Sequence, residues 1–291
     1  MEITSAAQPH FPPPARCSPP DLLVLGAGGP VGLAWQLGWL AEAADLLRNG
    51  VPVIGTSAGA MSGALLLLGP ERRQAITAAL RTAPRQATAP APADSTPART
   101  TNPPDTELRQ AAAASYDGGP EAISALGKLM AARPDDGSHL EQVRQMVGEE
   151  WPTGDLTVVA REVSTGKRKL FCGAVPLFLA VAGSSAAAGR TGPVTVSGQQ
   201  YIDGGYGSLL NSDLARGAGT VWLLAPAGLG FFTPETVPAL MREEVAELRA
   251  TGTHVEVFTP RGDFTDLSAF TEVGRAMDDG GQVARTWLSK P

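Results

Sequence analysis

Apolar residues follow two patterns along the chain. Short continuous runs rich in leucine, isoleucine and valine are typical of buried β-strands, and they lie at residues 21–25, 51–54, 156–160, 221–225 and 255–258. After residue 32 the leucines and alanines instead recur every three or four positions, which predicts a helix with one apolar stripe along residues 33–47. Strands that alternate with helices predict an α/β fold with a mostly parallel sheet covered on both faces.

The same periodicity predicts further helices, separated by glycine and proline stops. They span residues 59–68, 71–81, 107–114, 120–132, 138–148, 177–183, 235–250 and 266–288. Two β-hairpins are also predicted, one across Ser164-Thr165-Gly166 and one across Ser197-Gly198, because short strands flank these turn residues.

Two segments lack any periodicity. Residues 1–20 are rich in proline, and residues 82–106 consist mostly of proline, alanine and threonine, so neither segment can pack a core. We expect a disordered tail over 1–20 and a flexible insertion at about 82–106, within a single domain that spans 21–291.

Composition and charge narrow the class of protein. With 291 residues, of which 43% are apolar, the chain can build a sizeable core. A net charge of −6 argues against nucleic-acid binding, because no basic face is available to neutralise phosphates, but it leaves peripheral membrane contact open. The N-terminus lacks the features of a secretory signal, and the longest apolar window, at 53–69, is shorter than the roughly 18–20 residues of a membrane span. A cytoplasmic protein is expected.

Cysteine usage points to neither a disulfide nor a metal site. Cys17 and Cys172 are far apart in the sequence and show no CxxC spacing. Cys172 follows an apolar residue, which predicts a small side chain in the core.

The first candidate for chemistry is the pentapeptide GTSAG at residues 55–59, which joins a predicted strand to a predicted helix. In a nucleophile elbow a serine occupies such a strained turn, and the flanking glycines allow the chain to approach closely and expose the hydroxyl. This context makes Ser57 a candidate nucleophile between Gly55 and Gly59. The other interpretation is a tight strand-to-helix turn without chemistry.

The second candidate is the glycine-rich turn GAGGPVG at residues 26–32. A dinucleotide site is one interpretation, but Val31 stands where the GxGxxG pattern needs a glycine, and the second strand lacks a terminal acid for the ribose. An anion cradle made of backbone N–H groups is the other interpretation. Because Pro30 has no N–H, Gly28 and Gly29 would be the donors that an acyl-transfer oxyanion needs.

A serine nucleophile also needs a group that accepts its proton. Of the three histidines, His10 lies in the tail, His139 begins a polar helix and is expected to be exposed, and His254 could follow the chain order of other hydrolases. Asp203 is the better candidate, because it ends a short strand and the two glycines after it allow close approach to another turn. An ordinary turn aspartate is the alternative.

Together, these motifs resemble the patatin-like phospholipase family across residues 21–225. That family has a glycine-rich oxyanion loop, a GxSxG elbow and a later DG[GA] motif, which here are GAGGPVG, GTSAG and Asp203-Gly204-Gly205. Residues 201–205 and 211–215 also look like the bacterial members. The combination, in this order and spacing, is more specific than any single motif.

The resemblance implies a three-layer α/β/α sandwich and a Ser-Asp dyad that needs no histidine, metal or cofactor. By position, Ser57 would be the nucleophile and Asp203 the base. The implied reaction is hydrolysis of acyl esters, often of phospholipids or other lipids. Two alternatives stay open, a non-catalytic lipid-binding relative and a dinucleotide-binding α/β enzyme. The implied oxyanion loop comprises Ala27, Gly28, Gly29 and the helix start at Gly32.

The sequence departs from the family pattern at three positions. Val31 stands where many members carry arginine or lysine, and Ala27 replaces a common glycine but keeps its N–H. Bacterial relatives tend to have proline near Ala188, so the wall of the site is expected to be looser here. Residues 82–132 would be a lid over an acyl groove, or an insertion without function.

Overall fold

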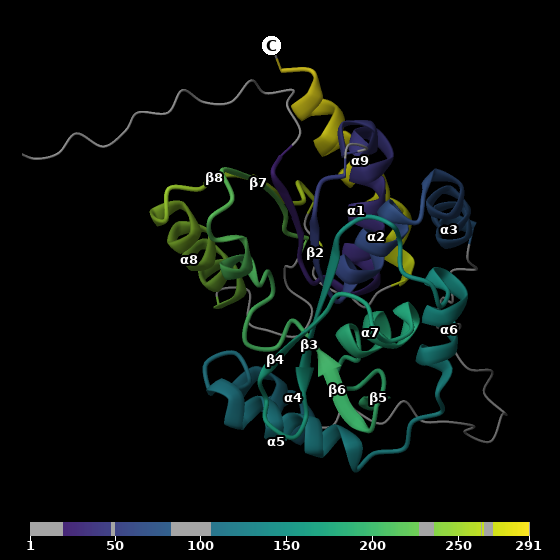
Figure 1. The fold of residues 1–291 in the computed structure, drawn as a ribbon, viewed down its shortest axis with the longest axis vertical. Helices are drawn as coiled ribbons and strands as arrows, with labels where there is room; N and C mark the ends of the chain where they lie inside the picture. The colour runs from purple at the N-terminus through teal and green to yellow at the C-terminus, as the bar shows by residue number, and fades with distance from the viewer. Residues whose placement is uncertain are drawn as a thin grey trace, which may run out of the picture.

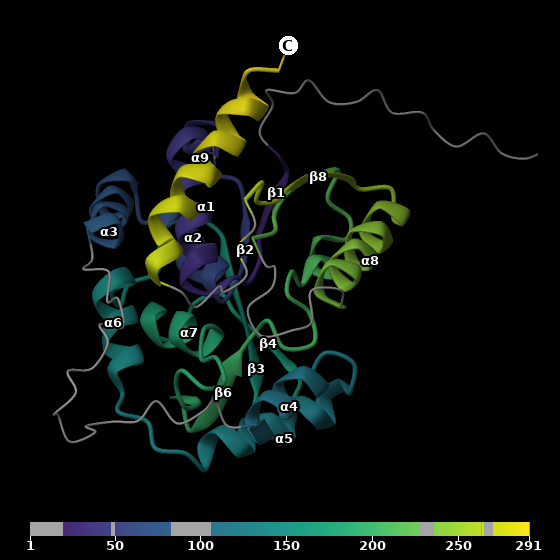
Figure 2. The same cartoon turned by 180° about the vertical axis from the view of Figure 1, so that it is seen from behind.

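Figure 1 and Figure 2 show a central β-sheet with helices on both faces. The computed structural model describes residues 20–47, 50–82, 106–226, 236–262, 264 and 270–290. Within these residues the strands form one eight-stranded sheet in the order β5-β6-β3-β2-β1-β7-β8, with β4 paired to β3 off this path. The strands are β1 (Leu22–Leu25), β2 (Val53–Thr56), β3 (Leu156–Glu162), β4 (Arg168–Phe171), β5 (Val194–Val196), β6 (Gln199–Asp203), β7 (Thr220–Leu224) and β8 (His254–Phe258).

The helices lie close to the predicted positions. They are α1 (Gly29–Ala43), α2 (Ala58–Leu67), α3 (Pro70–Thr82), α4 (Thr106–Ala114), α5 (Gly119–Ala131), α6 (Ser138–Val147), α7 (Leu177–Ser184), α8 (Thr236–Ala250) and α9 (Val273–Leu288). Short 3₁₀ helices occupy Ala44–Leu47, Ser212–Ala215 and Phe270–Glu272. β2 begins two residues later than predicted and includes Gly55 and Thr56. α9 begins at Val273, and the predicted start of this helix at 266 lies outside the described residues.

Parallel pairing dominates the sheet, as predicted. β1 pairs in parallel with β2 and β7, β2 with the first half of β3, and β7 with β8. The antiparallel ladders join β3 to β4, β3 to β6 and β5 to β6. The β3–β4 and β5–β6 pairs are the two predicted hairpins.

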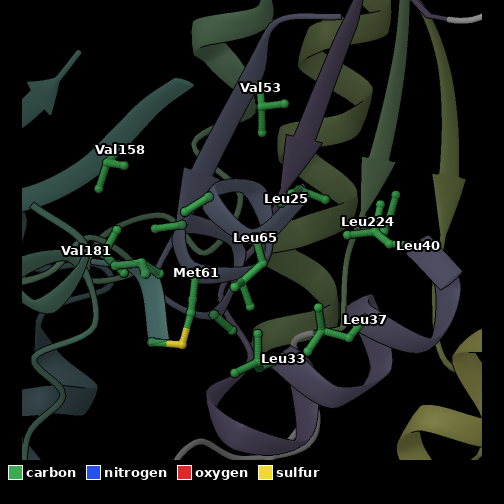
Figure 3. Close-up of a cluster of buried hydrophobic side chains, with 14 of the residues drawn as sticks. Leu25, Leu33, Leu37, Leu40, Val53, Met61, Leu65, Val158, Val181 and Leu224 are labelled. Carbon is green, nitrogen blue, oxygen red and sulfur yellow. The ribbon is translucent and has the colours of Figure 1, made fainter. Parts of the chain in front are cut away.

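Successive residues of the central strands point to opposite faces of the sheet, and each face carries its own apolar core. On one face Leu25 and Val158 pack with residues of α1, α2 and α7, and Figure 3 shows this cluster. On the other face Val24 and Val159 pack with residues of α8. In Figure 1, α8 lies on one side of the strands and α1 and α2 on the other. The fold is the predicted α/β/α sandwich.

The residues of the stripe predicted along 33–47 are buried, but α1 is buried on nearly every side, so the stripe is only part of its buried surface. Trp35 and Trp39 lie outside that stripe and are fully buried. The Trp35 Nε1 donates a hydrogen bond of 2.8 Å to Asp279 of α9, which covers α1 in Figure 2, whereas the Trp39 ring packs on Trp222 of β7 and Phe258 of β8. A Cβ at Gly38 would lie 2.0 Å from the carbonyl oxygen of Met277, and one at Gly280 would lie 2.0 Å from that of Trp35. The two helices can approach this closely because neither glycine has a side chain.

Several sequence expectations fall on residues that the structure does not describe. The tail over 1–20, apart from Pro20, and the insertion at 82–106, apart from its two ends, lie outside the described residues. Residues 107–132 are described, and α4 and α5 pack against Val163 and Ile202 at the end of the sheet. Cys172 is exposed, which corrects the prediction of a core side chain.

Candidate active site

The chain turns sharply at Ser57, between the last residue of β2 and the first residue of α2. Ser57 has φ 56° and ψ −116°, a backbone conformation that residues with a side chain rarely adopt. Such a conformation costs on the order of 1–3 kcal/mol and persists where the surrounding structure enforces it. The predicted strand, strained turn and helix are therefore all present at residues 53–67.

Two glycines of the motifs are required by close approach of the backbone. A Cβ at Gly59 would lie 1.9 Å from the carbonyl oxygen of Leu25, and one at Gly204 would lie 2.1 Å from that of Val159. Any side chain at either position would therefore push the elbow or the Asp203 turn away from the sheet. These contacts give a physical reason for glycine in the GTSAG and DGG motifs.

The strand β3 brings the two motifs together. The last residue of β2, Thr56, is the partner of Val159, while Asp203, the last residue of β6, is the partner of Ala160. β6 thus continues along the same edge of β3 where β2 stops. Ser57 and Asp203 meet at this junction, and the Ser57 Oγ donates a hydrogen bond of 2.6 Å to Asp203 Oδ2.

Burial shapes the electrostatics of this pair. Ser57 and Asp203 are 6% and 7% exposed, and burial raises the pKa of Asp203 from 3.8 to about 6. The hydrogen bond from Ser57 and a second one of 2.8 Å from the Gly205 N–H to Oδ1 oppose this rise, because both stabilise the carboxylate. A carboxylate with a raised pKa is a stronger base than an exposed one, so Asp203 can accept the Ser57 proton near neutral pH.

The glycine-rich loop lies against both motifs. A Cβ at Gly32 would be 3.9 Å from the Cβ of Ala58, and one at Gly205 would be 3.1 Å from the Cβ of Ala27. The Ala27 N–H donates to the Leu209 carbonyl at 2.9 Å, and the Gly32 N–H donates to the Gly28 carbonyl at 2.7 Å. Ala27 and Gly32 belong to the loop that the resemblance implies, but their N–H groups are already engaged in the structure.

The N–H groups of Gly28 and Gly29 differ in this respect. In the described part of the chain, no acceptor is bonded to the N–H of Gly28 or Gly29. Gly28 precedes α1 and Gly29 is its first residue, so both N–H groups belong to the end of the helix where the dipole favours negative charge. The loop can thus hold an anion through backbone groups alone.

A buried glutamine supports this loop from inside α1. Gln36 is fully buried, and its Nε2 donates to the Gly26 carbonyl at 2.9 Å. Its Oε1 accepts a hydrogen bond of 2.7 Å from Ser62 of α2. Gln36 therefore ties the glycine-rich loop to the elbow helix. Sequence reasoning missed it, and the only local signal was a polar residue inside an apolar helix.

Asn211 connects the segments that carry the two reactive side chains. Its Nδ2 lies 3.1 Å from Thr56 Oγ1, 3.2 Å from the Gly204 carbonyl oxygen and 3.0 Å from that of Ser208. Its Oδ1 accepts a hydrogen bond of 3.2 Å from Arg168. Thr56 precedes Ser57 and Gly204 follows Asp203, so the fully buried Asn211 side chain spans both halves of the site. The sequence marked residues 211–215 only as a resemblance, without a role.

None of the described histidines is bonded to the dyad. His254 begins β8 and pairs with Thr220, the first residue of β7, so it lies at the opposite end of the parallel strands from Ser57. His139 is half-buried rather than exposed as expected, and its Nε2 lies 3.2 Å from Ser185 Oγ and 3.3 Å from the Ala182 carbonyl oxygen. Burial lowers the pKa of His139. His10 lies outside the described residues.

The departures from the family pattern have structural explanations. Val31 is 1% exposed and belongs to the core cluster on the α1 face. The Ala188 N–H donates a hydrogen bond of 2.8 Å to the hydroxyl of Tyr206, which directly follows the DGG motif. A proline at 188 has no N–H for this bond. The hydrogen bond ties this wall to the Asp203 turn, and the looser wall stays a prediction.

The described residues contain neither a cluster of metal-ligating side chains nor a membrane-spanning helix. Nowhere among them do three or more His, Cys, Asp or Glu side chains gather as a metal site would require. Among the helices that the structure describes, none combines the length and the apolar character that spanning a membrane demands.

Comparison with known proteins adds a family match. The family model described as patatin-like phospholipase matches residues 23–215, which is more than half of the chain. No curated protein matched the sequence. Among solved structures, the type III effector protein ExoU aligns with 94% of this chain at 14% identity and a TM-score of 0.36. The chain spans 54% of the length of ExoU.

Proposed function

The chain belongs to the patatin-like phospholipase family, and from this premise we propose that it is a lipid acyl hydrolase of the phospholipase, lysophospholipase or esterase type. Its substrate would be a lipid or other acyl ester with a carboxylic ester bond. The single observation that carries the proposal is the hydrogen bond of 2.6 Å from the Ser57 hydroxyl to the buried Asp203 carboxylate. A hydroxyl held in a strained elbow beside a base of raised pKa is arranged for nucleophilic attack.

In the first half of the reaction, Asp203 Oδ2 accepts the proton of Ser57 as Ser57 Oγ attacks the ester carbonyl carbon. The carbonyl oxygen becomes an oxyanion in a tetrahedral intermediate. As that intermediate collapses, the bond to the alcohol oxygen breaks and Asp203 returns the proton to the leaving alcohol. The products are a free alcohol and an acyl group bound as an ester to Ser57.

In the second half, a water molecule takes the place of the alcohol. Asp203 accepts one proton of the water, whose oxygen attacks the acyl carbon. The second tetrahedral intermediate collapses by breaking the bond to Ser57 Oγ, which recovers the proton from Asp203. The net change is one ester and one water converted to one alcohol and one carboxylic acid, with the dyad restored.

The N–H groups of Gly28 and Gly29 are assigned to the oxyanion in both halves. The support is their place at the start of α1 and the engagement of the neighbouring Ala27 and Gly32 N–H groups elsewhere. Fixed backbone donors stabilise charge that develops in the transition state without reorganising, and loss of one such donor typically costs about 10²–10³ in rate.

We also propose that residues 21–291 act as a single hydrolase domain. The support is that one sheet contains strands from Leu22 to Phe258, and that α9, near the end of the chain, packs on α1 near its beginning. The residues of the proposed site come from β2, β6 and the loop before α1, so the site needs most of the chain.

Hydrolysis of short- and long-chain p-nitrophenyl esters and of phospholipid in mixed micelles tests the proposal, together with labelling by a fluorophosphonate probe. We expect wild type to turn over esters and to be labelled at Ser57. Ser57→Ala and Asp203→Asn should each lose activity by at least about 10³-fold. His254→Ala is the matched control and should retain activity, because His254 lies at the far end of the sheet.

The same measurements separate the alternatives. A lipid-binding relative without catalysis would bind vesicles but would neither be labelled nor release acid. A dinucleotide enzyme would gain thermal stability with a nucleotide and remain unlabelled. Full ester hydrolysis by both Ser57→Ala and Asp203→Asn would show that the proposed dyad is wrong.

A further inference from the structure

A second serine, Ser184, lies beside the dyad and takes no part in the chemistry proposed above. It is the last residue of α7 and is fully buried. Its position in the sequence is 127 residues after Ser57. The sequence analysis assigned Ser184 no role.

The Ser184 hydroxyl makes two hydrogen bonds, and one of them reaches the nucleophile. Its Oγ donates to the Val159 carbonyl at 2.6 Å, which uses its single hydrogen. The free lone pairs of the oxygen then accept the backbone N–H of Ser57 at 2.9 Å. The bond to Val159 thus orients the Ser184 hydroxyl as an acceptor, which is the role that the Ser57 N–H requires.

This bond acts on the strained residue itself. Ser57 has φ 56°, and the direction of its N–H sets where the elbow turns and where its side chain points. The Ser57 side chain makes no capping bond to the helix that follows, and its Oγ is bonded to Asp203 instead. The Ser184 hydroxyl is therefore the group that holds the backbone N–H of the elbow in the buried site.

The same segment also holds the base. The Gly204 N–H donates to the Ser184 carbonyl at 3.0 Å, and the Asp203 N–H donates to the Ala186 carbonyl at 3.0 Å. Residues 184–186 thus bond to the backbone on both sides of the hydrogen bond between Ser57 and Asp203. The side chain of Ser184 holds Ser57, and its carbonyl holds Gly204, the residue after Asp203, so Ser184 links the two segments that carry the dyad.

We infer that Ser184 is a positioning residue, whose hydroxyl holds the Ser57 backbone so that the Ser57 Oγ stays in line with Asp203. The inference rests on the proposed function, because it assigns Ser184 a part in the reactivity of Ser57. Ser184 touches neither the substrate nor the reacting atoms, and its effect on the reaction passes through the Ser57 N–H. Misplacement of a reacting group by about 1 Å can cost on the order of 10²-fold in rate.

Four variants test the inference. Ser184→Ala removes the hydroxyl, and Ser184→Thr restores a hydroxyl on the same carbon. Ser184→Cys replaces the hydroxyl by a somewhat larger thiol, whose sulfur is a weak acceptor. Ser185→Ala is the matched control: it removes the neighbouring hydroxyl, whose bonds are to the Val181 carbonyl of its own helix at 2.8 Å and to His139.

The readouts are kcat and KM for a soluble ester and the time course of fluorophosphonate labelling at Ser57. We expect Ser184→Ala and Ser184→Cys to lower kcat by about 10-fold to 10²-fold with little change in KM. Labelling of both should reach the same final extent as wild type but with a smaller rate constant. Ser184→Thr should recover most of the rate, and Ser185→Ala should match wild type.

The labelling curve separates positioning from a loss of folded protein. A variant that is only less stable would label to a lower extent with the wild-type rate constant, which would overturn the inference. Equal rates for Ser184→Ala and Ser185→Ala would also overturn it. If wild type itself neither hydrolyses esters nor is labelled, the proposed function fails, and the inference falls with it.

Discussion

The Ser57 hydroxyl donates to Asp203 at 2.6 Å although 146 residues separate the two in the sequence. They meet because β2 and β6 occupy successive stretches of one edge of β3, with Thr56 opposite Val159 and Asp203 opposite Ala160. The contact buries a carboxylate that keeps two hydrogen-bond donors, and these opposing effects leave the pKa of Asp203 at about 6. This value has consequences for both activity and stability.

The activity should fall at acidic pH through the titration of Asp203. Only the carboxylate can accept the Ser57 proton, so kcat/KM for a soluble ester should be flat above about pH 7 and fall as the pH drops through about 6. At pH 5 we expect about a tenfold loss relative to the plateau. A pH profile of initial rates measures this.

The neighbouring titratable groups should not produce this decrease. Burial raises the pKa values of Tyr116 and Tyr206, so both stay neutral over this pH range. The pKa of Glu244 is also raised by burial, but Glu244 accepts its hydrogen bond from Ser208. Glu244→Gln should therefore show the same fall of kcat/KM at acidic pH as wild type. If the fall disappears in this variant, the titrating group is Glu244 and not Asp203.

Asp203 should also make the protein less stable at neutral pH. Because its pKa is raised from 3.8 to about 6, the folded state holds a proton that the unfolded chain releases between these values. The contribution of protonated Asp203 to the free energy of unfolding is therefore fully present below about pH 4. It is lost as the pH rises through about 6. At pH 8, Asp203→Asn should raise the free energy of unfolding by about 1–3 kcal/mol.

Denaturant unfolding of wild type and Asp203→Asn at pH 8 and pH 4 measures this difference. The gain should shrink at pH 4, because the wild-type carboxyl is then mostly protonated and no longer charged in its buried site. A gain of the same size at both pH values would mean that it does not come from titration of Asp203.

Asn211 should be important for stability, because its side chain joins Thr56, Gly204 and Arg168. Asn211→Ala leaves buried polar groups without partners, and we expect it to lower the free energy of unfolding by about 1–3 kcal/mol. Asn211 also has φ 50°, which alanine tolerates poorly. Asn211→Gly removes that backbone cost, so wild-type stability in this variant would show that the hydrogen bonds contribute little.

The close contact between α1 and α9 predicts that a glycine-to-alanine substitution has opposite effects on stability at two positions of α9. Gly280→Ala would place a Cβ 2.0 Å from the Trp35 carbonyl oxygen, and we expect a loss of about 3 kcal/mol. At Gly274 nothing lies within 4 Å of the added Cβ, and Gly274→Ala should gain about 0.5–1 kcal/mol from helix propensity. Thermal unfolding of both variants compares them directly, and equal effects would contradict this packing.

Most elements of the fold could be predicted because their signals are local. The apolar run at 21–25 and the small-residue turn at 197–198 contain the information for a strand and a hairpin within a few residues. The helix α1 shows the limit of that reasoning. Its spacing of leucines predicted one buried face, but α9 buries another, and the partner of that face lies more than two hundred residues away.

The residues of the site likewise divide into those with a local sequence signal and those without one. Ser57 and Asp203 were candidates because glycines beside each residue mark a close turn, and the structure places the two in contact. Nothing local marks Gln36, Ser184 or Asn211, since each is a single polar residue whose partners are far away in the sequence. Likewise, the sequence shows that Ala27 has an N–H, but the hydrogen bond of this N–H to the Leu209 carbonyl is visible only in the fold.

The short segments that could carry chemistry were recognisable in the sequence, because close approaches of the backbone restrict the residues allowed at Gly59 and Gly204. The sequence also determined the order of strands and helices. The pairing of Ser57 with Asp203, the pKa of that carboxyl and the buried hydrogen bonds around it depend on the folded chain. Hydrogen bonding and burial depend on distances between segments, and those distances are set once the sheet has brought β2 and β6 to the same edge of β3.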